Sequence, residues 1–293
     1  MDLLTIALTR YSQSDDLVSP CLQSVAKQNH AHGRVLFLDQ NERPDVQKLC
    51  KFLSSEQMVF EYRTIPARGC AYARNTAITL CRTAILLWTD PDVVLASDWA
   101  SKMAHVLATN QSDIVGGKIV PLWHTRPRWY MRTNVMADHY SLIDLGDDTR
   151  PIDRIIGGSM GLHVGRLGQH ARFDERLGRQ DGTLLGGVDA EFCERALVEG
   201  FRVHYVGSTV AKHQITIERT RLKWIARKFY YGGLSRGLRG GKPRSMNQKR
   251  RLGDYMVLCV FAPLYLAGLL SARHRKNRLK ERSLTGSCLK EEQ

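Results

Sequence analysis

The chain has 293 residues, of which 43% are hydrophobic and 25% are charged, so its composition is globular and excludes a wholly disordered chain. Its seven cysteines are scattered and include no C-x-x-C pair, which excludes a disulfide framework and indicates free thiols in a reducing cytosol. The net charge of +14 arises in one region, because residues 1–211 carry 23 Lys and Arg against 24 Asp and Glu, whereas residues 212–293 carry 20 against 5.

Short apolar runs alternate with amphipathic stretches along the first 120 residues. The apolar runs predict strands at residues 3–9, 35–38, 58–62, 84–89 and 114–120. The amphipathic stretches predict helices at residues 15–29, 45–53 and 71–80, and one that Ser97 or Asp98 caps and that ends near residue 107. This alternation predicts a mostly parallel sheet with helices on both faces. Ligands bind such sheets beyond the carboxyl ends of the strands, here Thr9, Arg10, Asp39 and Asp90.

The second half of the chain is less regular. Residues 121–154 are rich in Trp, Tyr, Arg and Asp with weak periodicity, which predicts loops and short elements over the site. Residues 155–164 contain three glycines, so we expect the backbone to pass close to another group there. The remaining predicted elements are a helix at 189–199, strands at 201–206 and 209–213, and a basic aromatic helix at 219–231.

The basic C-terminal region surrounds an uncharged, mainly apolar run of 18 residues at 255–272. A membrane span needs about 20 such residues, so one interpretation is a membrane-embedded or interfacial segment, and the other is a core helix of a soluble domain. The surrounding cations favour polyanionic partners, meaning anionic lipid headgroups or nucleic acid. Because the sequence contains no known nucleic-acid-binding module, we expect an anionic membrane surface and no nucleic acid.

The motif Asp90-Pro91-Asp92 follows the apolar strand predicted at residues 84–89. In extended backbone, residues i and i+2 project to the same side, so the two carboxylates can converge while Pro91 stiffens the link. Two carboxylates at one edge suit Mg²⁺ or Mn²⁺, which also bind phosphate oxygens. The alternative is a turn in which the aspartates bind backbone groups.

A second motif, residues 68–75 with the sequence R-G-C-A-Y-A-R-N, opens the helix before that strand. Gly69 allows a ligand to approach the backbone closely, and a helix N-terminus attracts anions. The alternative is an ordinary helix start with surface arginines at Arg68 and Arg74.

Together these segments resemble glycosyltransferase family 2, which has the GT-A fold, over about residues 3–235. In that family the first strand ends in a Thr and Asn/Arg pair, the second ends in an aspartate that contacts the nucleotide base, and a G-x-A-x-A-R-N segment precedes D-x-D. The resemblance implies donor-binding residues at Thr9, Arg10, Asp39, Arg68, Gly69, Arg74, Asn75 and Asp90. It implies a divalent metal, Mn²⁺ or Mg²⁺, with ligands Asp90, Asp92 and His213.

The downstream segments of the family also have counterparts here. They are a glycine-rich acceptor segment at 157–160, F-D-E-x-L-G at 173–178, Val188-Asp189 at the position of the family's acidic E-D pair, and a strand that ends in His213. The resemblance implies that Asp189 is the base of an inverting transferase, and that the acceptor contacts Gly157, Gly158, Ser159 and Val188. The alternative for Asp189 is a helix N-cap. The alternative for His213 is a histidine at the end of a strand whose ring nitrogens are hydrogen-bonded within the protein.

Two positions depart from the family pattern. Val188 replaces the usual Glu of the E-D pair, which affects acceptor choice or activity, and Glu191 is close enough in sequence to substitute in part. The acidic D-D-x-S after the second strand is Asp39-Gln40-Asn41-Glu42, so one carboxylate near the base is absent and uracil is less favoured.

The resemblance implies an α/β GT-A domain at residues 1–235, with a nucleotide-sugar-binding half at 1–120 and an acceptor-binding half at 121–235, followed by a basic tail at 236–293. The expected function is transfer of a sugar from a UDP- or GDP-sugar donor to a hydroxyl of a glycan or lipid-linked acceptor, in cell-surface polysaccharide or glycolipid synthesis. The expected location is the cytoplasmic face of a membrane, bound through the C-terminal region. The alternative is a catalytically impaired sugar-nucleotide-binding partner of a membrane glycan-assembly complex.

Overall fold

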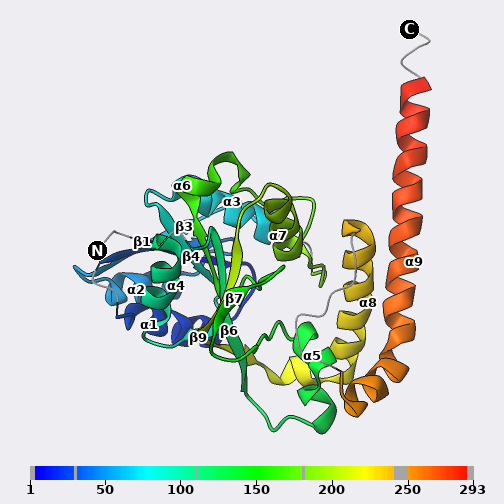
Figure 1. Ribbon diagram of the computed structural model, residues 1–293, viewed down its shortest axis with the longest axis horizontal. Coiled ribbons are helices and arrows are strands. Elements are labelled where there is room, and N and C mark those ends of the chain that lie inside the picture. Colours follow the sequence, from blue (N-terminus) through cyan, green and yellow to red (C-terminus); the bar gives the residue numbers. More distant parts are fainter. Residues whose placement is uncertain (1–3, 30–31, 110, 180–181, 241–249, 289–293) are drawn as a thin grey trace.

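The computed structural model describes residues 4–29, 32–109, 111–179, 182–240 and 250–288. Figure 1 shows an α/β body built on one sheet, with two helices, α8 and α9, that lie side by side at its edge. The far end of α9 extends beyond the body toward the C-terminus. The predicted α/β architecture with a helical C-terminal region is therefore confirmed.

The described residues form one nine-stranded sheet in the order β3-β2-β1-β4-β8-β6-β9-β5, with β7 paired to β9. The strands are β1 Leu4–Arg10, β2 Gly33–Asp39, β3 Met58–Thr64, β4 Ile85–Thr89, β5 Val93–Leu95, β6 Ile114–Trp123, β7 Thr149–Pro151, β8 Met160–His163 and β9 Val203–Ile215. The pairs among β1 to β4 are parallel, as predicted, and so is β6 with β9. Strand β8 runs antiparallel between β4 and β6, which brings the glycine-rich segment to the centre of the sheet.

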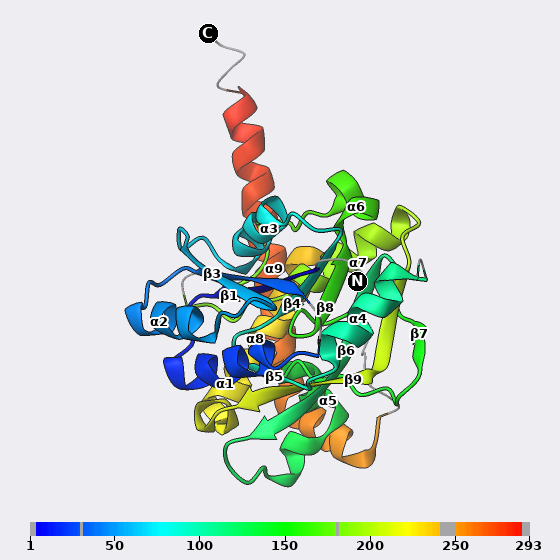
Figure 2. The ribbon, with the colours of Figure 1, turned by 90° about the vertical axis from the view of Figure 1, so that its left-hand side faces the viewer.

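The helices cover both faces of the sheet. They are α1 Asp15–Ala26, α2 Pro44–Leu53, α3 Cys70–Leu80, α4 Trp99–Ala108, α5 Asn134–His139, α6 Val164–Leu167, α7 Val188–Val198, α8 Leu222–Arg239 and α9 Leu252–Cys288. Helices α1, α2 and α4 bury their apolar faces in one core cluster, whereas α3 and α7 contribute to a second cluster. Figure 2 shows α3 on one side of the first three strands and α1 and α2 on the other.

Strand alternation explains these two cores. Val35 and Phe37 of β2 enter the first cluster, while Leu36 and Leu38 enter the second. Successive side chains of a strand point to opposite faces, so an apolar run with helices on both sides is buried throughout. This is why β1, β2 and β4 could be predicted from their apolar runs, whereas β3, at the edge of the sheet, is only partly buried.

Three sequence predictions need correction. The strands predicted at 201–206 and 209–213 are one strand, β9, whose pairing with β6 shifts register between Gly117 and Lys118. Strand β5 was not predicted, because three residues are too few to show a period. The basic helix begins at Leu222 and not at residue 219, since Ile217–Thr220 forms a separate 3₁₀ turn, and it continues to Arg239.

Helices α8 and α9 are packed backbone to backbone through glycines. A Cβ atom on Gly233 would lie 1.9 Å from the carbonyl oxygen of Tyr265, and one on Gly268 would lie 2.0 Å from that of Tyr230. Small residues allow helices to approach this closely. The domain boundary predicted between residues 235 and 236 falls inside α8, and parts of the predicted tail, 241–249 and 289–293, lie outside the described residues.

The predicted apolar segment lies within α9. Residues Leu252–Lys276 are long and apolar enough to cross a membrane, with a mean hydropathy of 1.9, and only 17% of the most apolar window is buried. Large apolar side chains on this helix face solvent, including Tyr255 (54% exposed), Val260 (65%) and Leu270 (62%). Such exposure is unlike a core helix of a soluble domain, and it agrees with a membrane-associated segment.

Candidate active site

The D-x-D motif lies at the carboxyl end of β4, near the centre of the sheet. Thr89, the last residue of β4, donates a hydrogen bond from Oγ1 to the carbonyl oxygen of Gly158 at 3.0 Å. Asp90 is half-buried, whereas Asp92 is 3% exposed. The two carboxylates therefore have different surroundings and take part in separate clusters.

Asp92 lies in a cluster with His213 and Arg219. Strand β5 pairs with β9 so that Val93 lies opposite His213, which brings Asp92 beside that ring. Arg219 donates from Nη2 to Oδ2 of Asp92 at 2.6 Å, and its Nη1 lies 2.6 Å from Nε2 of His213. A guanidinium can only donate, so Nε2 accepts, and Nδ1 carries the proton that it donates to the carbonyl oxygen of Tyr140 at 2.7 Å.

The electrostatics of this cluster favour an ionised Asp92. Burial raises the pKa of the Asp92 carboxyl, but the charge of Arg219 outweighs that effect, and the pKa lies well below its ordinary range. Oδ2 of Asp92 and Nε2 of His213 are 3.4 Å apart, and both have lone pairs directed toward the Arg219 guanidinium.

This donor set suits a divalent metal in part. A carboxylate and a neutral imidazole, whose Nε2 lone pair here accepts a hydrogen bond from Arg219, are ligands that Mn²⁺ accepts. Within the described ranges, however, no group of three or more His, Cys, Asp or Glu side chains is close enough to hold a metal ion. Asp92 and His213 therefore fit as two of the predicted ligands, Asp90 does not join them, and the Arg219 guanidinium supplies the positive charge between them.

A second cluster forms around Arg74 of α3, which is 5% exposed. Arg74 donates from Nη1 to Oδ1 of Asp189, and its Nη2 lies 3.8 Å from Oδ1 of Asp90. Burial lowers the pKa of the guanidinium, but nearby carboxylates, chiefly Asp189, outweigh this and raise it above its ordinary value. Desolvation raises the pKa of Asp90, and Arg74 opposes that rise. The cluster thus joins both predicted carboxylates through one buried cation.

The glycine segment lines this second cluster. The backbone N–H of Gly157 donates to Oδ2 of Asp189 at 2.9 Å, and a Cβ atom on Gly157 would lie 2.0 Å from Nη2 of Arg74. A Cβ atom on Gly158 would lie 3.6 Å from Oδ2 of Asp90. Both glycines therefore lie beside the two carboxylates, and a side chain at 157 would displace the Arg74 guanidinium.

Two predicted acceptor contacts are directed away from the site. Ser159 is fully buried, and its Oγ accepts a hydrogen bond from Nε1 of Trp99 at 2.8 Å. Val188 is 4% exposed and packs in the second core cluster. The physical reason for Ser159 is the turn at Gly157 and Gly158, which closes with a hydrogen bond from the Ser159 N–H to the carbonyl oxygen of Ile156 and leaves the hydroxyl beside Trp99.

Arg10 and Asp39, both predicted to bind the donor, are also buried. Arg10 is 0% exposed and donates to Asp39 at 3.2 Å and to Asp15 at 3.1 Å. Asp39 also accepts from the Tyr62 hydroxyl at 3.0 Å and from the Asn41 N–H at 2.9 Å, and burial raises the pKa of its carboxyl. Their hydrogen-bonding groups are engaged inside the protein, and the donor contacts that the sequence pattern predicted for them stay a prediction.

Hydrogen bonds from other segments hold the segment at 68–75 in place. Oε1 of Gln40 accepts from the N–H groups of Arg68 and Gly69 at 3.0 and 2.8 Å, and Gly69 has a φ of 97° that favours glycine. The Asn75 amide binds the N–H and C=O of Phe173 at 2.8 and 3.0 Å, which leaves little capacity for the predicted donor contact. Arg68 differs, since its side chain is 62% exposed.

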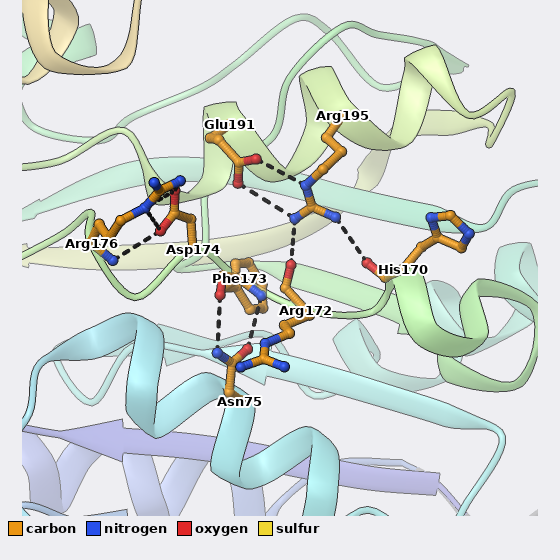
Figure 3. A network of polar contacts seen from close by, with 8 residues as sticks. All are labelled: Asn75, His170, Arg172, Phe173, Asp174, Arg176, Glu191 and Arg195. Atoms are coloured by element: carbon orange, nitrogen blue, oxygen red, sulfur yellow. Dashed lines mark hydrogen bonds and ion pairs between the residues drawn. The ribbon is translucent and has the colours of Figure 1, made fainter. Parts of the chain in front are cut away.

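Figure 3 shows how the F-D-E segment is held beside α7. Arg195 donates from Nε to Oε1 of Glu191 at 2.9 Å and also binds the carbonyl oxygens of His170 and Arg172. Glu191, which we expected to substitute in part for the carboxylate missing at Val188, is therefore bound in this network and does not face Asp189.

A cavity of about 520 Å³ adjoins the second cluster, with Asp189 in its wall. It lies among residues of α5, α7, α8 and α9. Lys228 of α8 also lines it, and burial, together with the charges of Arg179 and Arg219, lowers the pKa of Lys228 to about 7. Neither Lys228 nor Arg219 was singled out from the sequence, because both are ordinary members of a basic region.

We expect Arg219→Met to strengthen binding of Mn²⁺ in the absence of nucleotide. In the wild type, a cation that reaches Asp92 and His213 must first displace two charge-assisted hydrogen bonds from Arg219. Losing even one such bond, at about 1.4 kcal/mol, corresponds to about a tenfold gain in affinity for the variant. Titration of Mn²⁺ followed by electron paramagnetic resonance measures this, and adding His213→Ala should remove the gain. Equal affinity in wild type and Arg219→Met would contradict the assignment.

Lys228→Met should make the protein more stable, in a pH-dependent way. The folded-state pKa of Lys228 is about 7, and the unfolded value is about 10.4. The unfolded state therefore binds more protons between pH 7 and pH 10, so the wild type gains stability as pH rises through that window. The variant's advantage should be greatest at pH 7 and below and should shrink toward pH 10.

Thermal unfolding in neutral detergent from pH 6 to pH 10 tests this, with the exposed Lys223→Met on the same helix as the control. A stability difference that stays constant across the range would show that Lys228 is not a strained cation.

The comparisons with known proteins agree with this architecture. The family model described as Glycosyl transferase family 2 matches residues 8–162, more than half of the chain. Pre-mycofactocin glycosyltransferase of Mycobacterium tuberculosis (strain ATCC 25618 / H37Rv) is 28% identical over 173 residues, which are 57% of this chain and 34% of the relative. The same-named protein of strain CDC 1551 / Oshkosh matches equally. The chain thus spans about a third of the length of the curated relatives it matches.

Solved structures share the fold. A mannosyltransferase of Pyrobaculum calidifontis, in complex with GDP-Man and Mn²⁺, has a TM-score of 0.58 at 17% identity and covers 98% of this chain and 79% of that one. GalNAc-T7 with UDP, GalNAc and Mn²⁺ has a TM-score of 0.57 at 12% identity, over 83% and 52% of the two chains. S. aureus TarS 1–349 has a TM-score of 0.54 at 13% identity, over 79% and 64%. The fold is GT-A, and from the family match the chain belongs to glycosyl transferase family 2.

Proposed function

We propose that this protein is an inverting glycosyltransferase that moves a sugar from a UDP- or GDP-sugar to a hydroxyl of a glycan or lipid-linked acceptor. The observation that supports this most directly is the bridge that Arg74 makes between Asp189 and Asp90 beside Gly157. It puts the candidate base next to the motif that the donor's diphosphate would approach. The solved relatives with UDP or GDP-Man support the choice of donor class.

In this reaction the acceptor oxygen attacks the anomeric carbon as the bond from that carbon to the diphosphate oxygen breaks. The hydroxyl proton passes to a carboxylate oxygen of Asp189, and the nucleoside diphosphate leaves with the bonding electrons. Each Asp189 oxygen accepts one hydrogen bond, from Arg74 or from Gly157, and keeps a lone pair for the hydroxyl. The base is therefore held in place without being fully occupied.

The departing diphosphate carries negative charge that the site must balance. Arg219 and Arg74 are cations at the two ends of the D-x-D motif. A divalent ion, Mn²⁺ or Mg²⁺, bound by Asp92 and His213 with Asp90 as the predicted third ligand, would supply Lewis-acid stabilisation of that group. Arg68, at the start of the fixed segment 68–75, has an exposed side chain and is the candidate contact for the nucleotide end of the donor.

We place this activity at the inner, cytoplasmic face of a membrane, in surface polysaccharide or glycolipid synthesis, with residues 1–120 and 121–235 as donor and acceptor halves. The exposed apolar face of α9 and the basic residues around it support an attachment through residues 236–293. A second candidate is a catalytically impaired sugar-nucleotide-binding partner. It is favoured by Val188 in the position of the usual Glu and by Arg219 between the two metal-ligand candidates.

Calorimetric titration with UDP and GDP, with and without Mn²⁺, should show metal-dependent binding of one nucleotide. Asp92→Ala should weaken this binding by at least about tenfold, because it removes a charged ligand that the diphosphate–metal pair requires. The variant's unfolding temperature is measured alongside as the control for folding. Absence of binding by either nucleotide under any metal would overturn the donor-site assignment.

Asp189→Asn should lower turnover by about 100-fold or more while nucleotide affinity stays within a factor of two, since a positioned base contributes about 10²- to 10⁴-fold. Release of nucleoside diphosphate from the donor, in the presence of a membrane extract as acceptor source, measures turnover. Asp45→Asn is the matched control, because its side chain is 82% exposed and contacts Lys48. Nucleotide binding without turnover in the wild type would favour the second candidate function.

A further inference from the structure

The cavity beside Asp189 is enclosed by helices that the donor site does not use. Its walls come from α5, the segment before Gly157, the start of α7 and the facing sides of α8 and α9. In both ribbon views, α5 lies beside the α8–α9 pair. Because Asp189 lies in its wall, we expect the sugar acceptor to reach Asp189 through this cavity.

The charge in the cavity is strongly positive. Five cationic side chains line it, against the two carboxylates of Asp138 and Asp189. Lys228 makes no hydrogen bond or ion pair with any residue that the structure describes, and the groups that set its pKa are burial and two arginines. A cation held in this way destabilises the protein, and an anion bound beside it would offset its charge. Clustered cations of this kind suit phosphate oxygens.

The cavity is also apolar on the side of α9. Leu258, Ala262 and Leu266 of that helix line it, and Leu266 is 56% exposed, so the wall is continuous with the outer apolar face of α9. That outer face belongs to the helix that is long and apolar enough to cross a membrane. An occupant could therefore place an anionic head on Lys228 and leave an apolar chain along α9 toward the lipid.

We infer that the cavity binds the phosphate headgroup of a membrane lipid that is the sugar acceptor, with Lys228 as its central contact and the α9 wall along its chain. This inference rests on the proposed function, since it takes Asp189 as the base that faces the acceptor. Two features carry it together: a cluster of cations around an unpaired lysine, and the continuity of the cavity with the exposed apolar helix.

The test is titration of the full chain, in dodecyl maltoside micelles at pH 6.5, with dodecyl phosphate, dodecanol and inorganic phosphate. Dodecyl phosphate should bind, and dodecanol and inorganic phosphate should each bind at least tenfold more weakly. Lys228→Met should weaken the binding of dodecyl phosphate at least tenfold. Lys223 is exposed on the same helix, and the affinity of Lys223→Met for dodecyl phosphate should stay within twofold of the wild type. Unfolding temperatures of both variants show that they are folded.

Three results would overturn the inference. One is dodecyl phosphate binding no tighter than dodecanol. Another is an equal loss of affinity for dodecyl phosphate in Lys228→Met and Lys223→Met, which would indicate general attraction to a basic surface. The third is inorganic phosphate competing as well as dodecyl phosphate, which would mark a free-phosphate site.

Nucleotide titration separates this inference from the proposed function. Lys228→Met should keep the nucleotide affinity of the wild type. If the wild type binds nucleotide but does not bind dodecyl phosphate, the proposed function is kept and the inference about the cavity is wrong. A wild type that binds no nucleotide would overturn the proposed function, and with it the acceptor role of the cavity.

Discussion

The buried guanidinium of Arg74 is the contact on which the arrangement of the site depends. It joins α3 to Asp189 at the start of α7 and lies near Asp90 at the end of β4. The ring of Phe173 lies 5.3 Å from it, so the cation is enclosed by apolar surface as well. Breaking a buried ion pair by removing one partner costs about 3–5 kcal/mol, because the other charge is left uncompensated. This one side chain therefore links three of the segments that carry the chemistry, and the hydrogen bond from Gly157 to Asp189 adds to the link.

Arg219 has a comparable role on the other side of the D-x-D motif. It arises from the 3₁₀ turn after β9 and reaches back to Asp92 and to His213 near the end of that strand. The proton on Nδ1 of His213 goes to the carbonyl of Tyr140, which is stacked on Trp224 of α8 at 5.6 Å between ring centroids. The candidate metal ligands are thus coupled through packed groups to the helix pair at the edge of the body.

The α8–α9 pair connects the exposed apolar surface of α9 with the cavity at Asp189. Glycine contacts hold α8 and α9 in backbone contact, so the inner face of the apolar helix becomes a wall of the cavity at Asp189, while its outer face stays exposed. The geometry brings the exposed apolar helix and a candidate base to one continuous cavity.

The sequence by itself determined the β/α alternation, the position of the D-x-D motif after a buried strand and the glycines beside it, because these depend on local periodicity and on short motifs. Tertiary structure decided which charged groups meet. Arg74 and Asp189 are 115 residues apart, and Arg219 and Asp92 are 127 apart, so no local pattern pairs them. It also buried Arg10, Asp39 and Ser159, since the exposure of a polar side chain depends on which strands and helices pack against it.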